Sequence, residues 1–317
     1  MQNKKVPELL VQYLRDELPE QEHYGYVVLA NKDKAIDFTG DTKNQPFYLR
    51  SCAKPLQASL IIDFEMDKFY NMTEEEIALC CASHAGEEVH VNIAKNLLAK
   101  FELNENDLSC GLHKPLSKTE QTKLLLENKK ETILQNNCSG KHIMMLGLCK
   151  MKGWDLKNYD NPNHPLQIAI KEKIYELCNI TKDYPITKDG CGVPIMSMPL
   201  ENMLHGYLNV FCNSKYEKIK NAFLNHPYII GGENRTDTKI IENSQNIVAK
   251  VGAGGLCIVV NTNSEEAFVV KISDCDMKAR ELVVCQILKN LKWANIEVDN
   301  TIKTLHGEIV GKIIVTI

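Results

Sequence analysis

The sequence predicts an α+β protein in which strands from both ends of the chain form one five-stranded antiparallel sheet. The strand-like segments lie near the two ends and are rich in β-branched and aromatic residues. Because two or three strands rarely make a stable sheet alone, we expect the two sets to pair. The chain between them, about residues 51–224, should then be a large, mostly helical insertion. The five segments are YGYVVLA (24–30), AIDFTG (35–40), LCIVVN (256–261), AFVVKIS (267–273) and EIVGKIIVTI (308–317).

Turn and capping signals define the elements in order. The residues NKDK after YGYVVLA are typical of a turn, which makes the first two strands a hairpin. Thr73 followed by Glu76 is the pattern of a capping box at a helix start. Apolar residues at helical spacing predict further helices over residues 87–101, 166–177 and 277–291.

Composition is that of an ordinary globular protein, and we treat residues 1–317 as one domain. The charged fraction is 25%, the hydrophobic fraction is 44% and the net charge is -4, so no strong field favours nucleic acid or an anionic membrane. The first twenty residues are polar and amphipathic and do not resemble a secretory signal. No run of 18 apolar residues occurs. We therefore expect a cytoplasmic protein that does not bind a membrane.

Twelve cysteines is a high count for such a chain. In a chain of this size without a leader, reduced thiols are expected, and no CxxC pair indicates a zinc ribbon or a thioredoxin-type site. Most of these cysteines should be small buried hydrophobic residues. Those in apolar or helical contexts are Cys80, Cys81, Cys149, Cys178, Cys212 and Cys285.

The stretch YLRSCAKPLQAS places a potential nucleophile, Ser51, three residues before a potential base, Lys54. Proline is tolerated only in the first turn of a helix, so Pro55 predicts a helix that begins close to Ser51. The two side chains then share one helix face. The positive end of the helix disfavours an ammonium, which helps a neutral lysine accept the serine proton. The alternative interpretation is a serine N-cap followed by a solvated lysine.

Terminal strands that share a sheet, with a helical insert that carries an S-x-x-K, follow the plan of the serine β-lactamases and penicillin-binding enzymes. Four further stretches are rich in polar and small residues: CCASHAGEEVH (80–90), NNCSGKH (136–142), TKDGCGVP (187–194) and GAGGLC (252–257). Lys271, within the apolar strand FVVKIS, either faces solvent or points into a site as a base or charge partner.

The motifs RSCAKP, SHAGE, NNCSGKH and DGCGVP, in this order and at these separations, resemble those of the L-asparaginase II family, the class with paired serine–lysine dyads and a serine β-lactamase-like fold. The resemblance covers nearly the whole chain, from Arg50 to about Asp274. It implies that Ser51 pairs with Lys54, and that Ser83 pairs with Lys271. It also implies a homodimer.

The resemblance further implies one zinc ion per chain beside the active centre, held by Cys138, Lys141 and Cys191 and not acting as the direct catalyst. From the residues alone, these three side chains match no standard ligand spacing, which favours the alternative interpretation as unmetalled walls of the site. Asp189 and Cys257 match neighbouring site residues. The chain departs from the family at Gly254, where an acidic residue is usual, which puts a substrate contact there in doubt.

The expected reaction is hydrolysis of L-asparagine to aspartate and ammonia. Ser51 would attack with Lys54 as its base, and Ser83 with Lys271 would move a proton to the leaving amine, although the two serines could exchange roles. Arg50 and Arg235 are candidates for binding the substrate carboxylate, or are solvated structural arginines. His84 either contacts substrate or orients its neighbours.

Two other function classes fit the same residues. One is another serine acyl hydrolase or amidase on this scaffold, but such enzymes usually carry S-D-N and K-T-G motifs, and this chain has neither. The other is a zinc-dependent or amino-acid-sensing protein without turnover, which an assay of ammonia release would distinguish from an enzyme.

Overall fold

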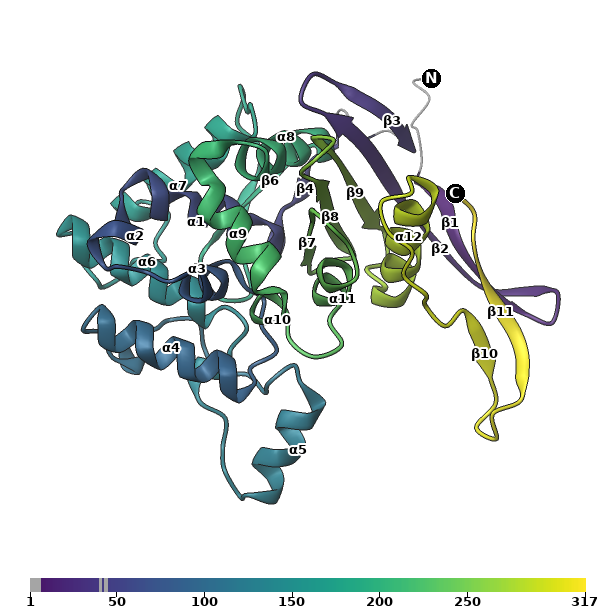
Figure 1. Ribbon diagram of the computed structural model, residues 1–317, viewed down its shortest axis with the longest axis horizontal. Coiled ribbons are helices and arrows are strands. Elements are labelled where there is room, and N and C mark those ends of the chain that lie inside the picture. The colour runs from purple at the N-terminus through teal and green to yellow at the C-terminus, as the bar shows by residue number, and fades with distance from the viewer. Residues whose placement is uncertain (1–6, 40–41, 43–44) are drawn as a thin grey trace.

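The computed structural model describes residues 7–39, 42 and 45–317. Its main feature is a curled antiparallel sheet of eight strands in the order β10-β11-β1-β2-β9-β8-β7, with β3 paired to β2 (Figure 1). The strands are β1 (Glu8–Arg15), β2 (Leu18–Asn31), β3 (Ala35–Thr39), β7 (Ile247–Gly252), β8 (Leu256–Asn261), β9 (Glu266–Ile272), β10 (Thr301–Lys303) and β11 (Ile309–Val315).

Strands from the two ends of the chain pair directly, as predicted. Val11 of β1 lies opposite Val315 of β11, and Tyr26 of β2 lies opposite Lys271 of β9. The predicted hairpin of β2 and β3 is also present, up to Thr39, and Gly40 lies outside the described residues. The sheet therefore joins chain ends that are about 300 residues apart.

The predicted number of strands was wrong, because the sheet has eight strands and not five. Strands β1, β7 and β10 were missed. The sequence of β1, ELLVQYLR, does not alternate strictly and contains residues that favour helices. Its strand state comes from pairing with β2 on one side and β11 on the other.

The helical insertion contains most of the helices, and the predicted ones are present. Thr73 and Glu76 form the predicted capping box at the start of α3. Pro55 lies in the first turn of α1, directly after a short 3₁₀ helix over Arg50–Ala53. The helices are α1 (Lys54–Asp63), α2 (Met66–Phe69), α3 (Glu74–Cys81), α4 (Glu88–Lys100), α5 (Lys118–Leu126), α6 (Ser139–Lys152), α7 (Pro165–Leu177), α8 (Leu200–Phe211), α9 (Glu217–Asn225), α10 (Pro227–Ile230), α11 (Thr236–Glu242) and α12 (Met277–Asn290).

Helices cover the central strands of the sheet. Helix α12 packs on β9 and β1, while α8 packs on β9, β8 and β2, and the two helices lie on different sides of the sheet (Figure 1). Consecutive residues of β9 from Ala267 to Val270 are therefore all buried. This two-sided cover explains why the central strands are continuous apolar runs.

A second, three-stranded sheet lies inside the insertion and holds the segment before Ser51. It consists of β4 (Phe47–Tyr48), β6 (Pro194–Met198) and β5 (Ile186–Lys188), with β6 in the middle. The Leu49 N–H also donates to the Met196 carbonyl at 3.1 Å. This pairing brings the 3₁₀ turn that carries Ser51 beside the turn between β5 and β6.

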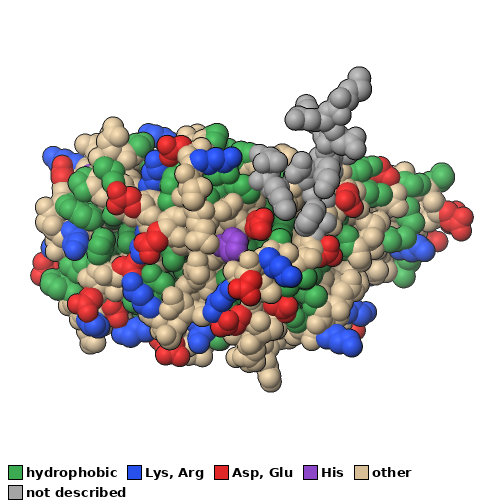
Figure 2. Space-filling view, turned by 90° about the horizontal axis from the view of Figure 1, so that it is seen from above, with side chains coloured by type: hydrophobic (Ala, Val, Ile, Leu, Met, Phe, Trp, Pro, Cys, Tyr) green, Lys and Arg blue, Asp and Glu red, His purple; other side chains and the backbone are tan. Residues whose placement is uncertain are grey.

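All twelve cysteines are free thiols, and most are buried. Of the six that were predicted to be buried, Cys212 is only partly covered. No helix in the described part of the chain is long and apolar enough to cross a membrane. On the face of the molecule shown in Figure 2, positive and negative side chains alternate and neither sign forms a patch.

Candidate active site

The motifs that the sequence singled out meet around a small pocket of about 200 Å³. Residues from the RSCAKP, NNCSGKH and DGCGVP stretches line it together with Ala253 of the turn between β7 and β8. The lining residues are Arg50, Ser51, His113, Asn136, Asn137, Cys138, Asp189, Gly190, Cys191 and Ala253. Segments more than 200 residues apart in sequence therefore form one polar pocket.

Ser51 lines this pocket from a strained turn. Arg50, just before it, has a φ of +47°, a left-handed conformation that is uncommon for a residue with a side chain. Such backbone geometry is typical of functional sites that the surrounding structure holds in place. Among the described residues, no hydrogen bond engages the Ser51 hydroxyl oxygen, so it is free to react.

Lys54 is almost completely buried and does not line the pocket. Its amine donates to the Ala82 carbonyl at 2.6 Å, to the Asn137 carbonyl at 2.8 Å and to Ser83 Oγ at 3.0 Å. Burial lowers the pKa of Lys54 to about 8, and the nearby Lys141 charge adds to this, while the Cys138 thiolate opposes it. A base with this pKa is neutral in a useful fraction of molecules near neutral pH.

The structure thus joins Lys54 to Ser83 by a hydrogen bond, whereas the sequence paired Lys54 with Ser51. Ser83 is buried and does not line the pocket, while Ser51 does. Lys54 begins helix α1 only three residues after Ser51. The lysine thus hydrogen-bonds the buried serine, and the accessible serine lies three residues before the lysine in the chain.

Arg50 and Asp189 form an ion pair at the pocket, with Arg50 Nε 2.7 Å from Asp189 Oδ1. Burial opposes ionisation of Asp189, but the positive charges of Lys141 and Arg50 outweigh it and lower the pKa of this carboxyl group. The pair uses Nε of Arg50, and a guanidinium has two further nitrogens that can donate. They are suited to a carboxylate ligand.

Cys138, Lys141 and Cys191 come together at the inner wall of the pocket. Lys141 Nζ lies 2.9 Å from Cys191 Sγ. A hydrogen bond from the Cys191 thiol lowers the pKa of Cys138 well below its usual value, so that Cys138 carries the negative charge of the pair. Burial disfavours the charged form of Lys141, but the Cys138 thiolate and the hydrogen bond to Cys191 outweigh burial and raise the pKa of Lys141.

The donor chemistry of these three side chains fits a zinc ion. Two sulfurs and one nitrogen in mutual contact supply three of the four ligands of a tetrahedral site and leave one for water. No group of three or more His, Cys, Asp or Glu residues that could bind a metal occurs in the described ranges. A zinc site here therefore depends on Lys141 in its neutral form, with zinc taking over the charge that balances the thiolates.

We expect purified protein to contain about one zinc ion per chain, because thiolate sites bind this metal tightly. Replacing Cys138 and Cys191 together by serine should remove the zinc, as measured by elemental analysis. Cys285→Ser, a change of another buried cysteine outside the pocket, is the control and should keep the metal. Full zinc content in the double variant would place the metal elsewhere in the chain.

The other candidate residues lie outside the pocket lining. His84 is buried, and its two ring nitrogens are 3.0 Å from Ser139 Oγ and 3.1 Å from the Gly86 N–H. Burial lowers the pKa of His84 well below its ordinary value, so the ring is neutral and anchors the loop that carries Ser83. Cys257 is buried within β8.

Arg235 and Lys271 contact neither serine through a hydrogen bond in the described part of the chain. Arg235 precedes helix α11, and its Nε is buried without a hydrogen-bond partner. The Lys271 amine donates to the Ile272 carbonyl at 2.6 Å, and its charged neighbours are Asp274 and Cys275. The pairing of Lys271 with Ser83 stays a prediction.

A second buried lysine, which the sequence interpretation passed over, lies close to the site. Lys250 of β7 is completely buried with its amine 3.3 Å from Asp237 Oδ2. Its charge contributes to the lowered pKa of Lys54. The pattern VAKVG around Lys250 resembles FVVKIS around Lys271. The strand context alone therefore could not show which of the two lysines belongs to the site. The pocket residues His113, Asn136 and Asn137 were also missed, although both asparagines lie in a quoted motif.

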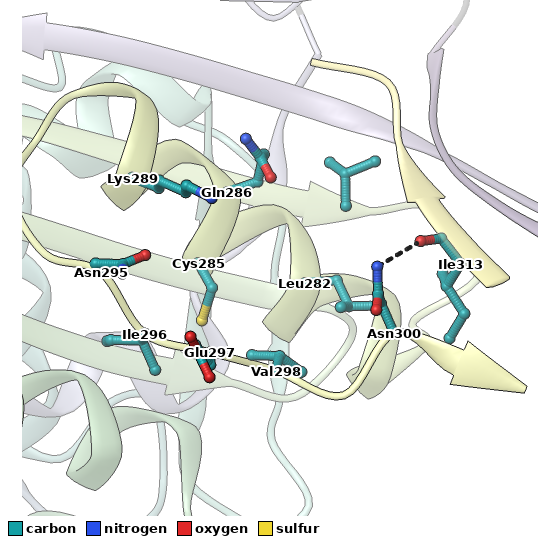
Figure 3. A pocket seen from close by; sticks show the side chains of 11 residues that line it. Leu282, Cys285, Gln286, Lys289, Asn295, Ile296, Glu297, Val298, Asn300 and Ile313 are labelled. Atoms are coloured by element: carbon teal, nitrogen blue, oxygen red, sulfur yellow. Dashed lines mark hydrogen bonds between the residues drawn. The ribbon is translucent and has the colours of Figure 1, made fainter.

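A larger cavity of about 390 Å³ lies between helix α12 and residues 295–300 (Figure 3). Cys285, Gln286 and Lys289 of α12 and Glu297 point towards it (Figure 3). Among the described residues, no serine lines this cavity. The smaller pocket at Ser51 is therefore the better candidate for the chemistry.

Comparisons with known proteins give one family match. The family described as L-asparaginase II matches residues 11–313, nearly the whole chain. No curated protein sequence matches it. Among solved structures, a β-lactamase from Mycobacterium bovis is 13% identical, covers 84% of this chain and 94% of its own, and has a TM-score of 0.42.

A second solved structure, a protein from Bacteroides dorei assigned as a β-lactamase, is 11% identical. The match covers 84% of this chain and 93% of that chain, with a TM-score of 0.45. Because both scores are below 0.5, our description of the architecture rests on the strand pairing above.

Proposed function

The chain belongs to the L-asparaginase II family, and from this premise we propose that it is an amidohydrolase that converts L-asparagine to aspartate and ammonia. The observation that carries the proposal is Ser51 in a small polar pocket, next to a buried lysine of lowered pKa whose amine donates to the carbonyl of Asn137 in the pocket lining. A serine needs such a base to attack an amide carbon at neutral pH.

In the proposed reaction, Ser51 Oγ attacks the side-chain amide carbon of asparagine and its proton passes to neutral Lys54. Ser83, which already hydrogen-bonds the Lys54 amine, moves the proton on to the departing nitrogen, and ammonia leaves. Water then hydrolyses the acyl-serine and aspartate is released. Backbone N–H groups at the start of the Ser51 helix are the natural donors for the oxyanion.

Recognition of the amino acid is assigned to the ion pair at the pocket. The free terminal nitrogens of Arg50 bind the α-carboxylate, and the second carboxylate oxygen of Asp189 accepts from the α-ammonium group. A pocket of about 200 Å³ suits a single small amino acid rather than a peptide. When bound by Cys138, Lys141 and Cys191, zinc would fix this wall of the pocket and polarise a water molecule.

The test is release of ammonia from L-asparagine, L-glutamine and a chromogenic cephalosporin, measured side by side with the same enzyme preparation. We expect turnover of asparagine and none of the cephalosporin. Cleavage of the cephalosporin without amide hydrolysis would indicate another serine acyl hydrolase instead. Binding of asparagine without ammonia release would indicate a sensor. The cytoplasmic location and the homodimer stay predictions, and gel filtration with light scattering tests the second.

Activity should increase with pH through about 8, because Lys54 accepts a proton only in its neutral form and burial lowers its pKa to about 8. Below that pH the lysine is protonated and cannot serve as a base. The measurement is a pH–rate profile of kcat between pH 6 and pH 10, at saturating substrate. A profile that is flat across this range would show that Lys54 is not the titrating base.

A further inference from the structure

Lys250 and Asp237 form an ion pair in which both side chains are completely excluded from water. Such a pair costs free energy to bury, and removal of one partner leaves an uncompensated charge in the interior. The remaining contacts of the pair are few. Lys250 Nζ also lies 3.1 Å from the Val251 carbonyl, and Asp237 Oδ1 has no hydrogen-bond partner. The pair is therefore not explained by stability alone.

The pair is connected to the nucleophile through strand β7. The Lys250 carbonyl accepts from the Cys52 thiol at 3.3 Å, and Cys52 directly follows Ser51. Asp237 Oδ2 lies 3.4 Å from the Val251 N–H, one residue further along β7. Strand β7 ends at Gly252, and the next residue, Ala253, lines the pocket. The position of β7 thus sets both the Ser51 turn and one wall of the pocket.

We propose that Asp237 is a positioning residue for the reaction, because its carboxylate holds the Lys250 amine and the end of β7 against the turn that carries Ser51. This role rests on the proposed function of the Ser51 pocket. Asp237 does not line the pocket and acts through Lys250. Its loss should therefore slow the chemistry at Ser51 while leaving substrate binding by Arg50 and Asp189 intact.

The experiment compares wild type with Asp237→Asn, Lys250→Met and the double variant. Asp67→Asn is the matched control, since Asp67 is also a buried carboxylate paired with a lysine, 2.6 Å from Lys218, and lies outside the pocket. Two experiments are carried out. The first measures kcat and KM for asparagine. The second measures the rate at which a fluorophosphonate labels serine, and mass spectrometry identifies the labelled residue. Labelling bonds the serine oxygen to phosphorus with loss of fluoride, so it reports serine reactivity without any assumption about the substrate.

We expect Asp237→Asn to lower kcat and the labelling rate about 100-fold with KM nearly unchanged, because small displacements of a reacting group have effects of this size. Asp67→Asn should keep both rates. The double variant, which leaves no unpaired charge in the interior, should match Lys250→Met, since partners that act as a unit are not additive.

A normal labelling rate in folded Asp237→Asn would overturn the proposal, and so would a further loss in the double variant beyond Lys250→Met. The second comparison can still overturn the proposal where Asp237→Asn does not fold. If wild type labels at a serine but releases no ammonia, the asparaginase proposal fails, while the labelling rates still decide the role of Asp237.

Discussion

Ser51→Ala should lower kcat for asparagine by about 10⁴-fold or more, the size of loss seen when a catalytic serine is removed. The expectation follows from the position of Ser51, which lines the pocket on a strained turn, while Ser83 is buried behind it. Because the Ser51 hydroxyl has no hydrogen-bond partner among the described residues, its removal should leave the fold intact. The control is Ser59→Ala, a buried serine of the following helix α1 whose hydroxyl donates to the Leu56 carbonyl.

Lys54→Met should lower kcat by about 10² to 10⁴-fold, the usual contribution of a general base. The double variant with Ser51→Ala should be hardly worse than Ser51→Ala alone, since the two residues act as one unit. Near-normal turnover in Ser51→Ala, with full loss in Ser83→Ala, would show that the buried serine is the nucleophile and that the pocket opens further in solution than in this structure.

The fold could be predicted from sequence wherever local signals and packing agree. The side chains of Thr73 and Glu76 cap the helix locally, so the start of α3 could be predicted without tertiary information. Strand β1 could not be predicted in this way. Its residues fit a helix or a strand, and its strand conformation depends on pairing with β11, about 300 residues away. Strand β1 is one of the three strands that the prediction of five missed.

The site was predicted unevenly for a related reason. The motifs predicted that five residues lie at one site, and all five line the same pocket: Arg50, Ser51, Cys138, Asp189 and Cys191. Which partner a lysine finds is a matter of strand register and helix packing, which motifs do not contain. The hydrogen bond from Lys54 to Ser83 and the burial of Lys250 could therefore only be read from the structure.

The second lysine of the site can be identified by comparing Lys250→Met with Lys271→Met. Sequence resemblance points to Lys271. Lys250 is instead completely buried, its carbonyl accepts from Cys52 beside Ser51, and its charge contributes to the lowered pKa of Lys54. Without that like charge, Lys54 should hold its proton more tightly. We therefore expect Lys250→Met to lower kcat at pH 7 by about 10²-fold or more, as for other preorganised charges in active sites, and to shift the rise of the pH–rate profile to higher pH.

Stability separates the two lysines as well. Lys250→Met leaves the Asp237 carboxylate buried without a partner, which should lower the free energy of unfolding by about 3–5 kcal/mol. Lys271 is only half-buried, and its amine contacts a backbone carbonyl, so Lys271→Met should change stability by about 0.5 kcal/mol. Urea unfolding of both variants measures this difference directly. If Lys271→Met abolishes turnover while Lys250→Met keeps the wild-type rate and pH profile, Lys271 is the partner of Ser83, as the resemblance implies, and the charge of Lys250 has no part in activating Lys54.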